Sequence, residues 1–310
     1  MMKHISFLVG AVLAGVTVVP TFAAKVGDPA APLTIKEWVK GKAVDVKDGK
    51  NLYVVEFWAT WCGPCRVSIP HLTEVQKKFK DKGVVVIGIS DETTDKVKPF
   101  VEQQAEKMDY LVAIDDEHKS NKGYMQAYGQ NGIPHSFIVN KDGKMIWHGH
   151  PMAGLDQAIE DILSGKYDLK AATKADEARA ELDEFQTLSR DGDAKAKELG
   201  RKLLAAKGSD AEALCGFAFG IVADVGNKNR DFALADEALD KAEKADVSKK
   251  AQVVSIRAIS RFESGKQDDG IALIKQAIEA AKDANEKGRY ENFLKIMQQR
   301  QEAAQKKESK

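Results

Sequence analysis

Two cysteines lie three residues apart where an apolar segment gives way to an amphipathic one. The apolar segment is Leu52–Trp58, and the amphipathic segment runs from about Arg66 to Lys80. These patterns predict a strand followed by a helix. Cys62 and Cys65 then lie at the start of the helix and face each other across one turn, close enough to interconvert between dithiol and disulfide. The pair therefore indicates redox chemistry.

The position of Cys62 predicts a reactive thiol. In the first turn of a helix, unpaired backbone N–H groups and the positive end of the helix dipole favour an anion. We expect an exposed sulfur whose pKa lies below that of a free cysteine, by roughly one to several pH units. Cys62 is thus the candidate nucleophile. Cys65, one turn further in and less exposed, is the candidate that attacks the mixed disulfide and releases the partner. Pro64 suits this turn because it lacks an N–H.

A C-x-x-C pair can also supply half of a zinc site. Four ligands are needed, yet the remaining cysteine, Cys215, lies about 150 residues away, and no histidine pair has a zinc-site spacing. The strand before the cysteines and the helix after them favour redox chemistry, so we predict no metal and no cofactor. Cys215 itself, between Leu214 and Phe217, is expected to be a buried packing residue.

The segment Phe57–Cys65 (FWATWCGPC) resembles the active-site segment of thioredoxins, and Pro70 matches the proline in their helix. Ile133-Pro134 resembles their cis-proline loop. The resemblance covers residues from about 25 to 164 and is strongest to the exported TlpA/ResA-type thiol-disulfide oxidoreductases. It implies an α/β thioredoxin-like fold, with a central mixed sheet flanked by helices.

The resemblance also implies how a client protein is held. In this superfamily the cis-proline loop faces the nucleophile, which here places Ile133 and Pro134 beside Cys62, ready to pair with an extended segment. Trp61, Gly63 and Pro64 are the other expected substrate-binding residues.

Glu56 matches the buried aspartate that manages the proton of the inner thiol in thioredoxins, six residues before the first cysteine. Its neighbours are apolar, so we expect burial to raise the pKa of Glu56 towards the range of a general acid or base. The alternative is an edge-facing glutamate in water. Ser68 occupies a position that is often acidic in the family, which puts in doubt a close copy of its cytochrome-maturation members.

Residues 1–23 are expected to be a signal peptide: Lys3 supplies a positive charge, Ile5–Val19 is apolar, and small residues precede a cleavage point after Ala23. An uncleaved anchor is the alternative. No later apolar run approaches the roughly 20 residues that span a bilayer. We therefore predict an exported, periplasmic protein without a stable membrane span after cleavage. In an oxidising compartment it requires an external thiol donor, and a membrane-embedded protein is one candidate.

The composition changes after Pro151, because all eight prolines and all four tryptophans lie at or before it. The remainder is rich in Ala, Lys, Glu, Asp and Gln, which favours helices. We expect a thioredoxin-like domain at 24–166, a linker at 167–174, a helical domain at 175–305 and a charged tail at 306–310. Apolar positions recur after 35 residues, which resembles the helical hairpins of tetratricopeptide repeats; an unrelated bundle is the alternative.

Local patterns predict the remaining elements of the first domain. Segments 33–38 and 42–46 read as a hairpin around Gly41, 84–89 and 110–114 as strands, 95–107 and 155–163 as helices, and 137–140 with 144–147 as a hairpin. His148 and His150 share a strand face, and without a third ligand we treat both as solvated. His135 is either a residue that tunes the thiols or a surface or packing histidine.

Three functions remain in view. With 47 basic and 47 acidic residues the chain has no excess of positive charge for nucleic acid. The first hypothesis is a reductase of disulfides in client proteins, because Gly-Pro between the cysteines is typical of reducing thioredoxins. The second is a thiol peroxidase, although Ala59 stands where peroxiredoxins carry a hydroxyl residue. The third is a non-catalytic, redox-responsive scaffold whose helical domain binds partners.

Overall fold

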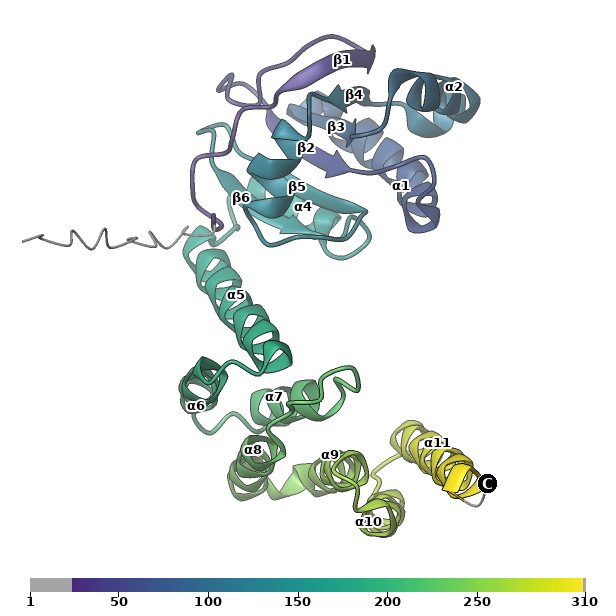
Figure 1. The fold of residues 1–310 in the computed structure, drawn as a ribbon. Helices are drawn as coiled ribbons and strands as arrows, with labels where there is room; N and C mark the ends of the chain where they lie inside the picture. The colour runs from purple at the N-terminus through teal and green to yellow at the C-terminus, as the bar shows by residue number, and fades with distance from the viewer. Residues whose placement is uncertain (1–23, 309–310) are drawn as a thin grey trace, which may run out of the picture. The chain divides into compact units, whose positions relative to one another are not determined.

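The structure, a computed structural model, describes residues 24–308. The expected signal peptide, residues 1–23, lies outside the described residues. The chain divides into two compact units, and the boundary follows Asp176. Figure 1 shows a unit of strands and helices followed by a unit made of helices. Among the described residues, no helix combines the length and apolar character needed to cross a membrane.

The first unit is built on one six-stranded sheet with the strand order β1-β4-β3-β2-β5-β6 (Figure 1). Strand β2 is central, runs parallel to β3 and antiparallel to β5, and β3 runs parallel to β4. The strands are β1 (Ile35–Lys40), β2 (Leu52–Phe57), β3 (Val84–Ser90), β4 (Leu111–Asp115), β5 (His135–Val139) and β6 (Met145–Gly149).

Every residue of β2 is buried, as expected for a strand covered on both faces. One face of the sheet packs against α1 (Gly63–Phe79), α2 (Thr94–Gln104) and α4 (Leu155–Leu163). The other is covered by the N-terminal segment and by residues around α3 (Lys119–Asn121) and η3 (Lys122–Gln126). Short 3-10 turns, η1 (Lys80–Lys82) and η2 (Ala105–Met108), follow α1 and α2. This mixed sheet with flanking helices confirms the thioredoxin-like fold.

The prediction of a hairpin formed by residues 33–38 and 42–46 is wrong. Strand β1 pairs antiparallel with β4, Ile35 lying opposite Asp115, and residues 42–46 form no strand. The alternation of apolar and polar residues identified a strand correctly. It carried no information about the partner, which lies more than 70 residues away in the sequence.

The expected linker at 167–174 also differs from the structure, because α5 (Leu169–Asp191) starts within it. The Tyr167 hydroxyl donates to the backbone carbonyl of Ile146. The Thr173 hydroxyl donates to the carbonyl of Val26 at 2.9 Å, and Leu169 packs against the core beneath α1. The first turns of α5 therefore belong to the first unit, up to Asp176.

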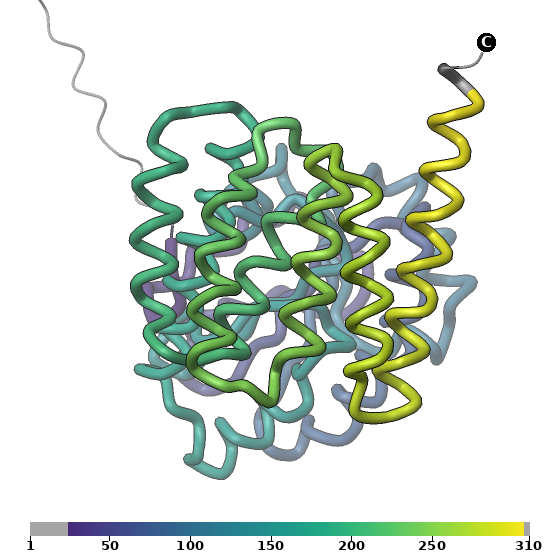
Figure 2. The backbone as a smooth tube through the Cα atoms, turned by 90° about the horizontal axis from the view of Figure 1, so that it is seen from below, coloured from purple at the N-terminus to yellow at the C-terminus, as the bar shows by residue number. Residues whose placement is uncertain are grey.

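The second unit is all helical, as predicted. It contains the rest of α5 and the helices α6 (Lys195–Ala206), α7 (Ala211–Val222), α8 (Phe232–Ala245), η4 (Val247–Lys249), α9 (Lys250–Glu263), α10 (Gln267–Glu279) and α11 (Ala284–Glu308). Figure 2 shows neighbouring helices side by side, and α7 packs with α8 as α9 does with α10. Gly270 permits the second contact, because a Cβ there would lie 2.8 Å from the carbonyl oxygen of Ala258. Cys215 is fully buried, as expected; the relation to tetratricopeptide repeats stays a prediction.

Candidate active site

Cys62 and Cys65 are joined by a disulfide bond at the start of α1. Helix α1 begins at Gly63, so Cys62 is its N-cap rather than a residue of its first turn. The backbone N–H of Cys65 donates to Cys62 Sγ at 3.1 Å. After reduction this N–H and the helix dipole would both stabilise a thiolate at Cys62.

The two sulfurs differ in burial less than expected. Cys62 is 3% exposed and Cys65 is fully buried in the disulfide form. The expectation of an exposed Cys62 sulfur is therefore wrong for this form, because Sγ is turned inward to its bond with Cys65. The predicted order of exposure is nevertheless correct, since Cys62 is the more accessible of the two cysteines.

Apolar side chains surround the disulfide on the surface. Trp61 is 71% exposed and Val67 63% exposed, and Gly63 and Pro64 between them are also exposed. Large apolar side chains that stay in water are typical of a surface that contacts a partner. The expected substrate-binding residues of this segment thus lie together around the cysteines.

The loop before β5 comes to the other side of the disulfide. The Ile133–Pro134 peptide bond is cis, as the resemblance implies. Cys62 Sγ lies 3.7 Å from the carbonyl oxygen of Ile133. A cavity of about 250 Å³ opens beside this loop, with Trp61 and Ile133 on its wall and Phe57 among its apolar lining. The cysteines, Trp61 and the loop at Ile133 are therefore brought together by the fold.

Glu56 lies beneath α1 and is fully buried, as predicted. It occupies the middle of the sheet, opposite Gly88 of β3 and Ser136 of β5. Burial raises the pKa of Glu56 to about 8, and a hydrogen bond from Ser68 partly offsets this rise. At neutral pH the carboxyl group is largely protonated, yet it can release or take up a proton in the range where thiols titrate.

Ser68 links this carboxyl group to the inner cysteine. Its Oγ lies 3.0 Å from Glu56 Oε1 and 3.0 Å from the carbonyl oxygen of Cys65. A hydroxyl has one proton, so it donates to Glu56 when that group is ionised and can turn to the carbonyl when Glu56 is protonated. The residue noted in the sequence only as a departure from the family thus contacts the predicted proton carrier.

Local sequence patterns did not mark the residues that hold the active-site loop. Both oxygens of the Glu92 carboxylate bind Thr60, accepting from its N–H at 2.6 Å and from its hydroxyl at 2.9 Å. The Arg66 guanidinium donates to the carbonyl of Thr60 from two nitrogens. Thr60 is thereby fixed two residues before Cys62. Glu92 is 32 residues away from it, beyond the reach of a local pattern.

The expectation that His148 and His150 are both solvated is wrong for His148. His150 is exposed, but His148 is buried and its ring contacts two other polar side chains. One ring nitrogen faces His135 and the other faces Asp176, each at 2.9 Å. Within residues 24–308, no group of three or more histidine, cysteine or acidic side chains is arranged to hold a metal.

Comparison with known proteins gives the same assignment for the first unit. Residues 26–148 match the AhpC/TSA family. The thiol-disulfide oxidoreductase ResA of Bacillus thuringiensis (strain Al Hakam) is 39% identical over 119 residues, which are 37% of this chain and 65% of that protein. The thiol:disulfide interchange protein HelX of Rhodobacter capsulatus is 29% identical over 191 residues, covering 57% of this chain and all of HelX.

A solved structure of a thiol:disulfide interchange protein from Chlorobium tepidum TLS has 27% identity, with a TM-score of 0.36, and the match covers 46% of this chain and 98% of that one. The match to ResA spans just under two thirds of the relative's own length. The family match and the matches to ResA and HelX confirm, for the first unit, the similarity to thioredoxin-like thiol-disulfide oxidoreductases that the motif predicts.

Proposed function

We propose that the protein is an exported enzyme that reduces disulfide bonds in client proteins. The observation that carries this proposal is the Cys62–Cys65 disulfide at the start of α1, whose outer sulfur lies 3.7 Å from the carbonyl of Ile133. A nucleophile and a backbone acceptor are thereby presented together to an extended client. The names of the relatives ResA and HelX support the same reaction class.

The first step requires the reduced protein. The Cys62 thiolate attacks one sulfur of the client disulfide, so that a bond from Cys62 to the client forms and the client's own S–S bond breaks. The departing client thiolate takes up a proton. The backbone N–H of Cys65 and the first turn of α1 stabilise the attacking thiolate before this step.

The second step releases the client. The Cys65 thiol loses its proton, and the resulting thiolate attacks Cys62 Sγ. The Cys62–Cys65 bond closes, the bond from Cys62 to the client breaks, and the second client sulfur leaves as a thiolate that takes up a proton. Glu56 is the group that accepts this proton, with Ser68 holding its carboxylate. The client has gained two electrons and two protons, and the protein is left as the disulfide seen here. An external dithiol donor then restores the reduced pair.

The reducing direction rests on Gly63 and Pro64 between the cysteines, the pair typical of reducing thioredoxins. Export rests on the pattern of residues 1–23. The helices of the second unit are proposed to bind partners, as arrays of helical hairpins do. No specific observation favours the thiol peroxidase or the non-catalytic scaffold over this reaction.

Reduction of insulin by dithiothreitol provides the test. We expect catalytic amounts of the full chain to accelerate the reduction, because the Cys62–Cys65 pair relays electrons faster than dithiothreitol reacts directly. Absence of any acceleration would favour the scaffold. Consumption of hydrogen peroxide without turnover of insulin would favour the peroxidase.

A further inference from the structure

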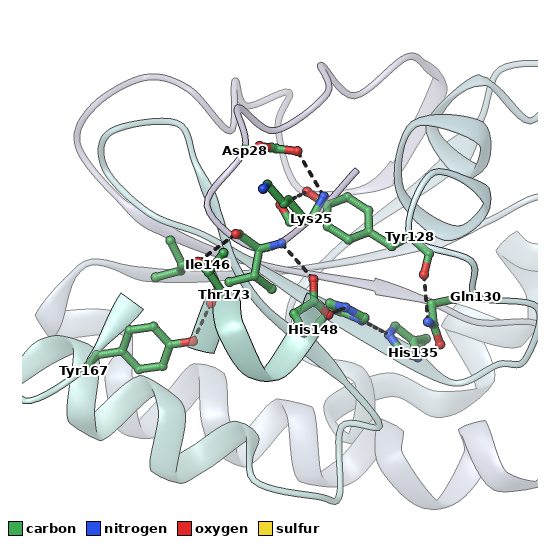
Figure 3. A network of polar contacts seen from close by, with 11 residues as sticks. Lys25, Asp28, Tyr128, Gln130, His135, Ile146, His148, Tyr167 and Thr173 are labelled. Atoms are coloured by element: carbon green, nitrogen blue, oxygen red, sulfur yellow. Dashed lines mark hydrogen bonds and ion pairs between the residues drawn. The ribbon is translucent and has the colours of Figure 1, made fainter. Parts of the chain in front are cut away.

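Four segments of the first unit meet at a buried polar network behind the cis-proline loop. They are the N-terminal segment at Lys25–Asp28, the loop that precedes β5, strand β6, and the first turns of α5. Figure 3 shows His148 of β6 lying between His135, the first residue of β5, and the start of α5, with Tyr128 and Lys25 nearby. Only the loop had been connected with the active site by the sequence.

Asp176 forms one end of a continuous chain of hydrogen bonds. Its Oδ2 accepts from the backbone N–H of Val26 at 2.9 Å, and its Oδ1 lies 2.9 Å from His148 Nε2. A carboxylate accepts only, so His148 Nε2 carries a hydrogen and donates it. The side chains of His148 and Asp176 are 2% and 9% exposed, so neither can replace this bond with water.

His148 passes the connection on to His135. The nitrogens His148 Nδ1 and His135 Nε2 are 2.9 Å apart, and one proton lies between them whichever ring supplies it. Phe137 stacks on the His148 ring and Tyr128 meets its edge, which leaves the ring little freedom to turn. The orientation of His135 is therefore determined from Asp176, across three side chains.

His135 directly follows Pro134 and begins β5, where it pairs with Phe57. The residue before Pro134 is Ile133, whose carbonyl oxygen lies 3.7 Å from Cys62 Sγ. A displacement of His135 would reach this carbonyl through two residues of backbone. Displacements of about 1 Å far from the reacting atoms can cost up to a hundredfold in rate.

We infer that Asp176, His148 and His135 are positioning residues for the reaction proposed above: their hydrogen-bonded chain holds the Ile133–Pro134 loop where it binds the client next to Cys62. The inference rests on the proposed function. Asp176 and the start of α5 lie beyond residues 26–148, the region that matches the family.

Asp176→Ala in the full chain tests the inference. It leaves the N–H groups of Val26 and His148 without their acceptor, so the loop is released while the cysteines are untouched. We expect the KM for insulin to rise by about tenfold. The rate at which iodoacetamide alkylates reduced Cys62 should stay within about twofold of wild type, because this small reagent needs no loop. Asp183→Ala, at an exposed site on the same helix, is the matched control.

Asp176→Asn distinguishes hydrogen bonding from charge. The amide oxygen can accept from Val26, and its NH₂ group can donate to His148 Nε2, which moves the ring hydrogen of His148 to Nδ1. We expect KM close to wild type together with this tautomer change in ¹⁵N NMR spectra of the imidazoles. His135→Phe keeps the contact with Phe137 but removes the hydrogen bond to His148, so it should raise KM as Asp176→Ala does. This variant provides the test if Asp176→Ala does not fold.

The outcomes are separable. Wild-type protein that does not turn over insulin would overturn the proposed function and this inference with it. Active wild-type protein, together with unchanged KM in Asp176→Ala and His135→Phe, would overturn the positioning role alone. A rise in KM that is matched by an equal fall in the alkylation rate would also overturn it, because the two changes together would indicate general damage to the first unit.

Discussion

Cys62→Ser is expected to reduce insulin turnover by more than about a thousandfold, to the level of dithiothreitol alone. The variant lacks the sulfur that forms the bond to the client, and a serine hydroxyl is too weak an acid to replace a thiolate. Insulin turbidity with a fixed dithiothreitol concentration measures the effect. Cys65→Ser should also lose turnover but should accumulate a mixed disulfide with the client, which mass spectrometry detects.

Cys215→Ser is the matched control for both variants. Cys215 is buried on α7, and burial raises the pKa of its thiol to about 11, so it remains protonated at neutral pH. We expect its replacement to leave turnover unchanged. Loss of activity in this control, or retention of activity in Cys62→Ser, would contradict the assignment of the nucleophile.

Glu56→Gln is expected to slow release of the client by about a hundredfold, the contribution typical of a general base. The ionised carboxylate takes the proton from Cys65, so the single-turnover rate of wild type should rise with pH and level off above about 8, the pKa of Glu56. Glutamine cannot accept the proton, so the remaining slow rate should follow ionisation of the Cys65 thiol itself and should not level off above about pH 8 as wild type does. Stopped-flow measurement of the mixed disulfide's decay across pH 6–10 provides the comparison.

The same pKa predicts how stability changes with pH. Because burial raises the pKa of Glu56 from 4.5 to about 8, the folded protein holds a proton that the unfolded chain releases between these values. The contribution of Glu56 to the free energy of unfolding is therefore largest below about pH 4.5, and it falls as the pH rises to about 8. A pKa change of this size corresponds to several kcal/mol. Urea unfolding of oxidised Glu56→Gln should lack this fall.

Ser68→Ala separates the ability of Glu56 to accept a proton from the pKa at which it does so. The hydrogen bond from Ser68 lowers the pKa of the carboxyl group, so its removal should move the inflection of the rate upward by about one pH unit without abolishing it. Ser164→Ala, at an exposed hydroxyl after α4, should leave the inflection in place. An inflection unchanged in Ser68→Ala would show that this hydroxyl does not act on Glu56.

The sequence predicted the parts of the site that depend on neighbours along the chain. Cys62 and Cys65 are three residues apart, and their environment follows from one strand and one helix. Glu56 was recognisable because it is the single carboxylate in an otherwise apolar strand, where burial is expected to change its pKa. The helices of the second unit followed from periodicity in the same way.

The parts that depend on distant contacts were missed. Glu92 and Asp176 reach their partners Thr60 and His148 over 32 and 28 residues, and nothing in the local pattern marks such a pair. The burial of His148 was missed for a similar reason. Its ring packs against Phe137 and Tyr128. The pairing of β6 with β5 shifts register between Met145 and Trp147, so simple alternation along β6 does not predict which face a residue occupies.

The reduction potential of the Cys62–Cys65 couple tests the central claim most directly. It is obtained by equilibrating the protein with dithiothreitol mixtures and counting free thiols by alkylation and mass spectrometry. A disulfide reductase requires a strongly reducing pair, and we expect a value near that of thioredoxin, about −270 mV. A value near −120 mV, typical of strong disulfide oxidants, would contradict the proposed direction of the reaction.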